Sequence, residues 1–382
     1  MKKAGRISII AVFVFLTAFF PLCSLIKGES DFSVKENRAL MTRPAVSFDD
    51  ILDGSFQKDY DEYLSDQFIF RDFWVGANTV LFRCIGKKDV NGVFFGRDGY
   101  LAEKYVPSDF DEELYGYNID VLSEFLNRES ESNINTSCIF VPSKGTVLKN
   151  RLPHFAKEFD SGFVCTEISS LTQGNAKVLD LTSALRAHNN EYIYYKTDHH
   201  WTVKGAYYGY NEIASSFGLN RHSADYYDFK TVSRSFVGST YDKVQRGSTR
   251  DTIIKTDVNN AHIISVDYDG DFETQKTLYQ NSFLKEKNKY DFLLGGNFRQ
   301  ITIKTDVNNG KTLLLIKDSY SNSLIPFIAE NYSKIIMIDL RYSSEPVQSL
   351  IDANRDITDL MVIYNVEKFM KDENQYLLEE QE

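Results

Sequence analysis

Short, mainly apolar segments alternate with helical patterns through most of the chain, and this alternation constrains the fold most. Between them, apolar residues recur at helical spacing, as from Val203 to Phe217, where Gly218 follows. Strands with continuous apolar runs are typical of sheets covered on both faces. The sequence therefore predicts an α/β domain with a mostly parallel sheet. The expected strands are 138–142, 177–180, 313–316, 335–338 and 360–364, with further helices at about 110–130, 320–331 and 347–353.

The predicted α/β domain covers residues 91–372 and is interrupted at about 220–310. That interruption is polar and glycine-containing, which indicates an insertion of loops and short β elements. At its start, residues 91–101 predict a hairpin around an Arg97-Asp98-Gly99 turn. Residues 29–90 form a juxtamembrane segment with one amphipathic helix, whose apolar positions are 56, 60, 63 and 64. Residues 373–382 form an acidic tail that is expected to fray.

The N-terminus carries a long uncharged segment. Ile7 to Ile26 contains twenty residues without a charge, and the preceding residues include Lys2, Lys3 and Arg6. This length matches one bilayer-spanning helix, and the basic flank places the N-terminus in the cytoplasm. We interpret residues 1–28 as a retained signal-anchor of a single-pass protein, with the domain outside the cytoplasm.

Two other readings of this segment stay open. A cleaved signal peptide has an apolar region of only about 7–15 residues and a cleavage site of small residues, which this segment lacks. A lipoprotein would use Cys23, but Phe20-Pro21-Leu22 places no small residue before it.

Composition excludes several classes of protein. Apolar residues make up 42% of the 382, which is enough for a full core. The 43 Lys and Arg against 54 Asp and Glu give a net charge of −11, which argues against nucleic-acid binding. Four cysteines without a CxxC pair predict neither a disulfide scaffold nor thiol catalysis.

A carboxylate and an imidazole lie two positions apart just before the predicted helix 203–217. In an extended segment the side chains of Asp198 and His200 point to the same side. A carboxylate in that position orients the ring and stabilises its protonated form. The alternative is that Asp198 caps the helix and both histidines are surface groups.

A serine follows the predicted strand 313–316, in the segment Lys317-Asp318-Ser319. A serine at a strand-to-helix turn presents its hydroxyl at the carboxyl edge of the sheet, where helix amides stabilise an oxyanion. The alternative is an ordinary helix-capping serine. A catalytic triad needs a nucleophile, a general base and a carboxylate that orients the base, and these roles fit Ser319, His200 and Asp198. The order of the three residues along the chain does not exclude a triad.

The segment Asp198-His199-His200-Trp201 is the motif that names the DHHW protein family. The chain is similar to the SGNH hydrolase-like acetyltransferase domains of the alginate O-acetylation proteins AlgJ and AlgX, in which a strand–Ser–helix element also follows an Asp-x-His-Trp segment. The resemblance implies a three-layer α/β/α sandwich with Ser319 as nucleophile, His200 as general base and Asp198 as its orienter. Further matching segments are Asn37-Arg38, 92–101, 141–144, 236–239 and Asp318-Ser319-Tyr320.

The sequence departs from the ordinary SGNH pattern in two respects. The serine follows the Asp-x-His segment instead of lying near the N-terminus, and Lys317 stands where that pattern has glycine. These departures leave the oxyanion hole unassigned.

Five further residues are candidates for binding substrate or an oxyanion. Asn297 offers an amide donor after two glycines, although a tight turn explains it equally. Lys144 follows a strand end and can bind an anion, Arg341 can clamp a carboxylate substituent, and Trp201 can stack on a sugar. His199 adjoins the proposed base. The alternatives are solvated cations and core aromatic residues.

The resemblance implies an extracytoplasmic O-acetyltransferase or acetylesterase of cell-surface polysaccharide, with an acetyl-Ser319 intermediate and no cofactor. The chain has no CoA-binding signature, so the implied acetyl donor is a membrane-bound O-acyltransferase partner. A non-catalytic glycan-binding or scaffold protein is the alternative. Asp198-His199-His200 also resembles the DHH phosphoesterase signature, but no Gly-Gly-Gly-His follows, and no metal site is predicted.

Overall fold

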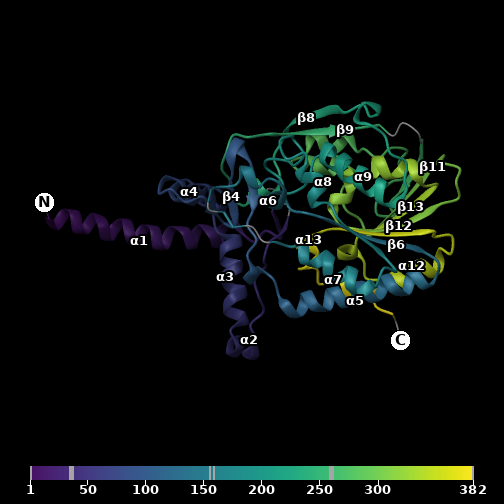
Figure 1. Cartoon of the computed structure of the whole chain (residues 1–382). Helices are drawn as coiled ribbons and strands as arrows, with labels where there is room; N and C mark the ends of the chain where they lie inside the picture. The colour runs from purple at the N-terminus through teal and green to yellow at the C-terminus, as the bar shows by residue number, and fades with distance from the viewer. Residues whose placement is uncertain (1, 34–37, 155, 158–159, 258–261, 381–382) are drawn as a thin grey trace. The chain divides into compact units, whose positions relative to one another are not determined.

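The computed structural model describes residues 2–33, 38–154, 156–157, 160–257 and 262–380. The chain divides into two compact units, and each is described here by itself (Figure 1). The smaller unit contains the residues up to Asn91 and Tyr241–Gly247, and the larger contains Gly92–Thr240 and the chain from Ser248. Asn37, which carries part of the expected family resemblance, lies outside the described residues.

The smaller unit begins with α1 (Lys2–Lys27). Its segment Gly5–Ser24 has a mean hydropathy of 2.4 and is unburied, so its length and composition suit a membrane span or a signal sequence. The predicted amphipathic helix is confirmed as α3, which contains all four expected apolar positions. The other elements are β1 (Phe32–Ser33), β2 (Arg38–Ala39), α2 (Phe48–Asp53), α3 (Ser55–Gln67), α4 (Arg71–Cys84) and β3 (Asp89–Val90).

A seven-stranded mixed sheet forms the centre of the larger unit, in the order β10-β11-β13-β12-β14-β6-β7. Its five consecutive strands from β13 to β7 are parallel, and β11 and β10 add to one edge in antiparallel fashion. All five predicted strands are confirmed, as is the α/β class. The strands are β6 (Asn135–Val141), β7 (Lys177–Asp180), β10 (Ile263–Asp267), β11 (Gln300–Thr305), β12 (Thr312–Lys317), β13 (Lys334–Ile338) and β14 (Asp359–Asn365).

Apolar side chains from both faces of this sheet are buried, which explains why its strands read as continuous apolar runs. In β6, Cys138 and Phe140 belong to one core cluster, and Ile139 and Val141 belong to the other. Helices therefore cover both faces (Figure 1). One face packs against α5 (Glu112–Glu131), α7 (Gly162–Thr172) and α12 (Val347–Ala353), and the other against α8 (Thr182–Arg186), α9 (Val203–Phe217) and α11 (Ile325–Ile328).

The segment after Ser319 differs from the single helix expected over 320–331. It consists of three short pieces: η7 (Ser319–Ser323), α11 and η8 (Ala329–Asn331). Pro326 lies in the first turn of α11, where its lack of an N–H prevents a helical hydrogen bond back toward η7. Ser319 is the first residue of the 3₁₀ turn η7.

The hairpin predicted over 91–101 is confirmed, since β4 (Val93–Phe95) pairs with β5 (Leu101–Glu103) around η1 (Arg97–Gly99).

The expected fraying of the tail is wrong in part, because Leu377 and Leu378 of η10 (Gln375–Leu378) are buried. The expected insertion contributes β10 and β11 to the main sheet. The remaining elements are η2 (Pro107–Asp109), α6 (Lys144–Val147), η3 (Lys149–Arg151), η4 (Ala224–Tyr226), β8 (Lys230–Phe236), α10 (Ser239–Asp242), β9 (Asp251–Lys255), η5 (Asn281–Lys285), η6 (Lys289–Phe292), η9 (Leu340–Tyr342) and α13 (Val366–Phe369).

Candidate active site

The loop before α9 places Asp198 against His200. Asp198 Oδ1 accepts the backbone N–H of His200 at 3.0 Å and lies 2.6 Å from His200 Nδ1. Thr202 caps α9 by accepting the Gly205 N–H, so Asp198 is not the helix cap of the alternative reading. The Asp198 carboxylate is therefore available to the imidazole ring.

Ser319 lies at the carboxyl end of β12, and its Oγ is 2.7 Å from His200 Nε2. Asp318 fixes this turn by accepting the N–H of Tyr320 and the N–H of Asn365 at the end of β14. With Nδ1 protonated toward Asp198, Nε2 accepts from the serine hydroxyl. The three predicted triad side chains thus form one hydrogen-bonded chain.

The second carboxylate oxygen of Asp198 is also occupied. It accepts the backbone N–H of Ser239 at 3.0 Å and its hydroxyl at 3.2 Å. A Cβ at Gly238 would lie 2.2 Å from the Cβ of Asp198, so only glycine permits this approach. Burial raises the pKa of Asp198, but the His200 and His199 rings and the hydrogen bonds lower it further, and the net pKa is well below the usual value.

Tyr290 contacts both the proposed base and the proposed nucleophile. Its ring stacks on His200 with centroids 3.9 Å apart, and its hydroxyl donates to the Ser319 carbonyl at 2.9 Å. Sequence reasoning missed this residue because it lies in the loop-rich segment, where no motif singles it out.

Lys144 and Asp251 hold the loop that carries Asp198. Lys144 Nζ donates to the carbonyls of Tyr195 and Asp198 at 2.8 and 2.6 Å, and burial lowers its pKa to about 8. Asp251 accepts the N–H groups of Lys196 and Thr197, each at 2.7 Å. Lys144 is buried, and its ammonium group donates to carbonyls of this loop. Its role here is structural, in place of the expected binding of an anionic group. No motif or spacing in the sequence singles out Asp251.

Lys317 fixes the side chain of Asn297. Its buried ammonium donates to Asn297 Oδ1 at 2.8 Å and to Asn322 Oδ1 at 3.0 Å. Among the described hydrogen bonds, none uses Asn297 Nδ2, so this amide keeps its donors. The lysine that replaces the SGNH glycine therefore orients a candidate oxyanion donor.

The other three candidates differ from their expected roles. Arg341 forms a bidentate pair with Asp339, at 2.8 and 2.7 Å, which occupies its guanidinium edge. Trp201 is fully buried and donates to the Tyr320 carbonyl at 2.9 Å, so it belongs to the core instead of stacking on sugar. His199 Nδ1 lies 2.7 Å from Ser239 Oγ, and burial together with the His200 ring lowers the pKa of His199 to about 3.

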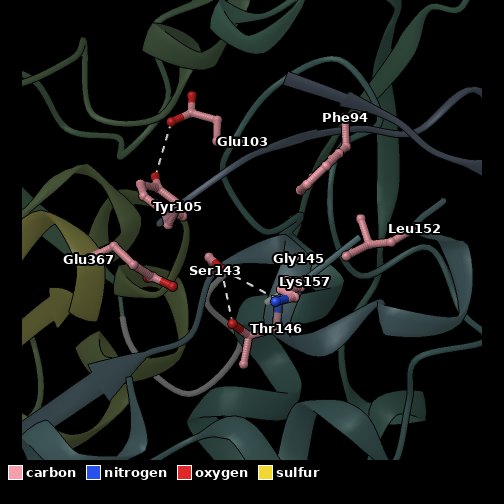
Figure 2. Close-up of a pocket in the computed structure, with 9 residues that line it drawn as sticks. All are labelled: Phe94, Glu103, Tyr105, Ser143, Gly145, Thr146, Leu152, Lys157 and Glu367. Carbon is pink, nitrogen blue, oxygen red and sulfur yellow. Dashed lines mark hydrogen bonds between the residues drawn. The ribbon is translucent and has the colours of Figure 1, made fainter. Parts of the chain in front are cut away.

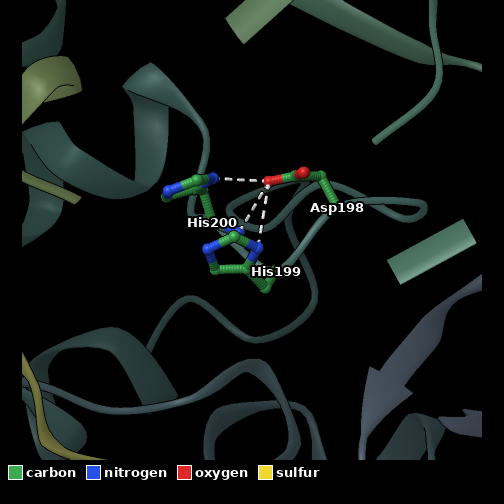
Figure 3. Close-up of side chains that lie close together, drawn as sticks. All are labelled: Asp198, His199 and His200. Atoms are coloured by element: carbon green, nitrogen blue, oxygen red, sulfur yellow. Dashed lines mark hydrogen bonds and ion pairs between the residues drawn. The ribbon is translucent and has the colours of Figure 1, made fainter. Parts of the chain in front are cut away.

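Asp198, His199 and His200 are also close enough to hold a metal ion, since their ligand atoms lie within 4.8 Å of one another (Figure 3). Both ring nitrogens of His200, however, already face Asp198 and Ser319. A metal ligated by His200 would displace one of these partners, so a metal site and the hydrogen-bonded chain are mutually exclusive here.

A small pocket, whose interior has room for about one water molecule, lies beside the carboxyl ends of β6 and β14. The Glu367 carboxyl is 1% exposed and points into it (Figure 2). Glu103, another lining residue, accepts the Tyr105 hydroxyl at 3.0 Å. Burial, which outweighs the lowering by Ser143 and Asn365, raises the pKa of Glu367 from 4.5 to about 7. The remaining lining residues are Phe94, Ser143, Gly145, Thr146, Leu152 and Lys157.

This carboxyl predicts a pH dependence of stability. Because the folded chain binds the Glu367 proton more tightly than the unfolded chain, its contribution is full below the unfolded pKa of 4.5 and is lost as pH rises through about 7. The loss is at most about 3 kcal/mol. Urea unfolding at about pH 4.5 and about pH 7.5 should therefore show a smaller pH difference in Glu367→Gln than in the unaltered chain. Equal pH differences in the two proteins would contradict a raised pKa of Glu367.

Comparison with known families confirms the resemblance expected from the Asp198–Trp201 segment. The family model of the DHHW protein matches residues 167–338. The model of the SGNH hydrolase-like domain of acetyltransferase AlgX matches residues 93–237. No curated protein matches the chain.

Solved structures share the fold. A DHHW family protein from Eubacterium siraeum has a TM-score of 0.63 and 24% identity, over 76% of this chain and 95% of that one. PatB1 of Bacillus cereus with a sulfonyl adduct has a TM-score of 0.62 and 19% identity, over 75% and 98%. The O-acetyltransferase domain of Pseudomonas putida AlgJ has a TM-score of 0.44 and 14% identity, over 76% and 94%. Because both identities are below 25%, the likenesses to the DHHW family protein and to PatB1 establish the fold only, and nothing is argued from the AlgJ domain.

Proposed function

We propose that this chain is an extracytoplasmic O-acetyltransferase or acetylesterase that acts on cell-surface polysaccharide through an acetyl-Ser319 intermediate. The observation that carries the proposal is the continuous chain of hydrogen bonds from Ser319 Oγ through His200 to Asp198, at 2.7 and 2.6 Å. The match to the acetyltransferase AlgX family model supports acetyl transfer as the reaction.

In the first half-reaction, Ser319 Oγ attacks the carbonyl carbon of the donor ester while its proton passes to His200 Nε2. Asp198 stabilises the imidazolium that forms, because it accepts the Nδ1 hydrogen and stays ionised. Asn297 Nδ2 supplies a donor for the oxyanion. When the tetrahedral intermediate collapses, His200 returns the proton to the departing oxygen and acetyl-Ser319 remains.

In the second half-reaction, the acceptor hydroxyl gives its proton to His200 Nε2 and its oxygen attacks acetyl-Ser319. Collapse of the second intermediate returns the proton to Ser319 Oγ and releases the acetylated acceptor. If water takes the place of the sugar hydroxyl, the same steps release acetate. Transferase and esterase activity therefore differ only in what occupies the acceptor position.

We place the domain outside the cytoplasm, anchored by α1, with the N-terminus inside. The apolar segment Gly5–Ser24 and its basic flank support this orientation. The donor ester would then be presented by a membrane-bound O-acyltransferase partner, since acetyl-CoA stays in the cytoplasm.

A serine-reactive fluorophosphonate separates catalysis from the non-catalytic alternative. An activated serine forms a covalent phosphonyl ester, whereas a serine in a binding or scaffold protein does not react. We expect stoichiometric labelling, located at Ser319 by mass spectrometry of the peptides and abolished in His200→Ala. Labelling of other serines alone, or none, would favour a glycan-binding or scaffold protein.

A further inference from the structure

The helix α4 of the smaller unit presents large apolar side chains to solvent. Their helical spacing places them on one face, which we call the outer face of α4. Each of these side chains is between 42% and 68% exposed. The five residues are Phe70 and Ile85 at the two ends of the helix and Phe73, Trp74 and Leu81 between them. An exposed apolar patch of this kind marks a contact with another protein or with a membrane.

The opposite face of α4 packs against the segment Tyr241–Gly247 through small residues. The Thr79 side chain is buried, and its hydroxyl donates to the carbonyl of Val244 at 2.8 Å. A Cβ at Gly76 would lie 3.3 Å from the carbonyl oxygen of Gln245, so the helix approaches this segment closely. In an amphipathic helix of a globular protein, the large apolar residues face the core. The arrangement in α4 is the reverse, because its large residues lie on the face away from the segment that holds it.

The outer face of α4 is continuous with the apolar helix α1. The ring of Phe20 lies 5.6 Å from Trp74 and 5.8 Å from Phe68, measured between ring centroids. Phe20 belongs to the apolar segment Gly5–Ser24, close to the end of α1 that the proposed orientation places outside the cytoplasm. Tryptophan and other aromatic residues are enriched at the two surfaces of a bilayer. The contact with Phe20 therefore places α4 where lipid surrounds the outer end of α1.

The charge around α4 fits an anionic lipid surface. Residues 70–88 contain four cations and one carboxylate, a net charge of +3, in a chain whose net charge is −11. Three of these cations, Arg83, Lys87 and Lys88, are exposed near the carboxyl end of the helix. Cations beside an apolar helix face are attracted to anionic head groups. A second copy of the chain is less suited to this face, since a symmetric contact would bring two groups of like charge together.

We propose that the outer face of α4 is immersed in lipid beside α1 and forms a second membrane contact of this chain. Arg83, Lys87 and Lys88 then lie among the lipid head groups. A single membrane helix leaves the attached unit free to turn about the helix axis, and a second contact fixes its orientation to the bilayer. The inference rests on the placement of α1 in the proposed function and is independent of the triad.

The chain contains two tryptophans, which allow a direct test. Trp74 lies on the outer face of α4, whereas Trp201 is fully buried in the core of the larger unit. We would reconstitute the full chain into vesicles of phosphatidylcholine and phosphatidylglycerol, with the phosphatidylcholine acyl chains brominated or unmodified. Because bromine quenches tryptophan only at close range, brominated vesicles should remove most of the Trp74 emission. The variant Trp74→Phe retains only Trp201 and should lose almost no emission.

A probe farther along the helix separates lipid contact of the whole outer face from contact near α1 alone. Leu81 lies about two turns after Trp74 on the same face. In the Trp74→Phe background, Leu81→Trp should restore strong quenching by brominated lipid and emit at shorter wavelength than an exposed tryptophan. Tyr376→Trp in the same background is the control, since Tyr376 is a 47% exposed aromatic residue of the larger unit. Its emission should be quenched by acrylamide in water and not by bromine.

Absence of quenching in the Leu81→Trp variant, or equal quenching in the Tyr376→Trp variant, would overturn the second membrane contact. Absence of quenching together with a dimer in detergent, measured by light scattering, would assign the outer face of α4 to a second copy.

Flotation of the vesicles after a urea wash distinguishes this failure from failure of the proposed anchor. If the chain floats with the vesicles and Leu81→Trp is not quenched, the α4 contact alone is wrong. If the chain does not float, both the anchor and the α4 contact are wrong. Fluorophosphonate labelling of Ser319 tests the enzymatic proposal separately from either result.

Discussion

Replacement of Ser319 by alanine is expected to lower acetyl-ester turnover by roughly three orders of magnitude or more, with the fold intact. The variant has no Oγ to form the acetyl intermediate, and His200 Nε2 loses the group it deprotonates. His200→Ala should cost about as much, because the two residues act as a unit and their effects do not add. Release of 4-nitrophenol from 4-nitrophenyl acetate measures the rate, and transfer to an oligosaccharide acceptor can be followed by mass spectrometry.

The same turn supplies a matched control. Ser321 lies two residues away in η7, is buried, and has no hydrogen-bond partner for its Oγ among the described residues. Ser321→Ala removes the same atom from the same turn and should leave turnover within about twofold. Retention of full activity in Ser319→Ala would eliminate the triad, and an equal loss in Ser321→Ala would indicate damage to the turn.

Replacement of Asp251 by alanine is expected to destabilise the larger unit by about 3–5 kcal/mol. Its buried carboxylate accepts the N–H groups of Lys196 and Thr197, and also the hydroxyls of Tyr192 and Thr197, each at 2.5 Å. Alanine would leave these donors without an acceptor in the interior. Urea unfolding monitored by circular dichroism measures the loss as a lower midpoint.

Asp251 also acts as a positioning residue, because the loop that it holds continues directly into Asp198. In Asp251→Ala protein that remains folded, kcat should fall more than KM changes, since the loop orients the base without contacting substrate. Asp257→Ala is the control: this carboxylate is 45% exposed in its pairs with Lys255 and Lys230, and its loss should cost about 1 kcal/mol or less. Equal destabilisation by the two changes would refute the role assigned to Asp251.

Local features of the site could be predicted because short-range geometry decides them. Asp198 and His200 are two residues apart, and the carboxylate–imidazole contact follows from their spacing. Ser319 follows the apolar run of β12, which places its hydroxyl at the carboxyl edge of the sheet. The strands were predictable for the same reason, since burial on both faces requires continuous apolar residues.

The roles of the long polar side chains could not be predicted. We expected three such side chains to face substrate: Lys144, Arg341 and Trp201. Instead, Lys144 and Trp201 donate hydrogen bonds to backbone carbonyls distant in sequence, and Arg341 donates to a neighbouring carboxylate. A lysine, an arginine or a tryptophan carries the same chemistry on the surface and in the interior, and only its burial and partners separate the two.

The sequence by itself determined the α/β class, the five parallel strands, the apolar N-terminal helix and the Asp-x-His pair, because each depends on periodicity or spacing of a few residues. Only the tertiary structure decided that Ser319 meets His200, across 119 residues, and that Tyr290 stacks on that ring. It also decided that Asp251 holds the loop and that Glu367 is buried beside the site. These contacts depend on which strand ends become neighbours in the sheet, and strand order is set by packing of the whole core.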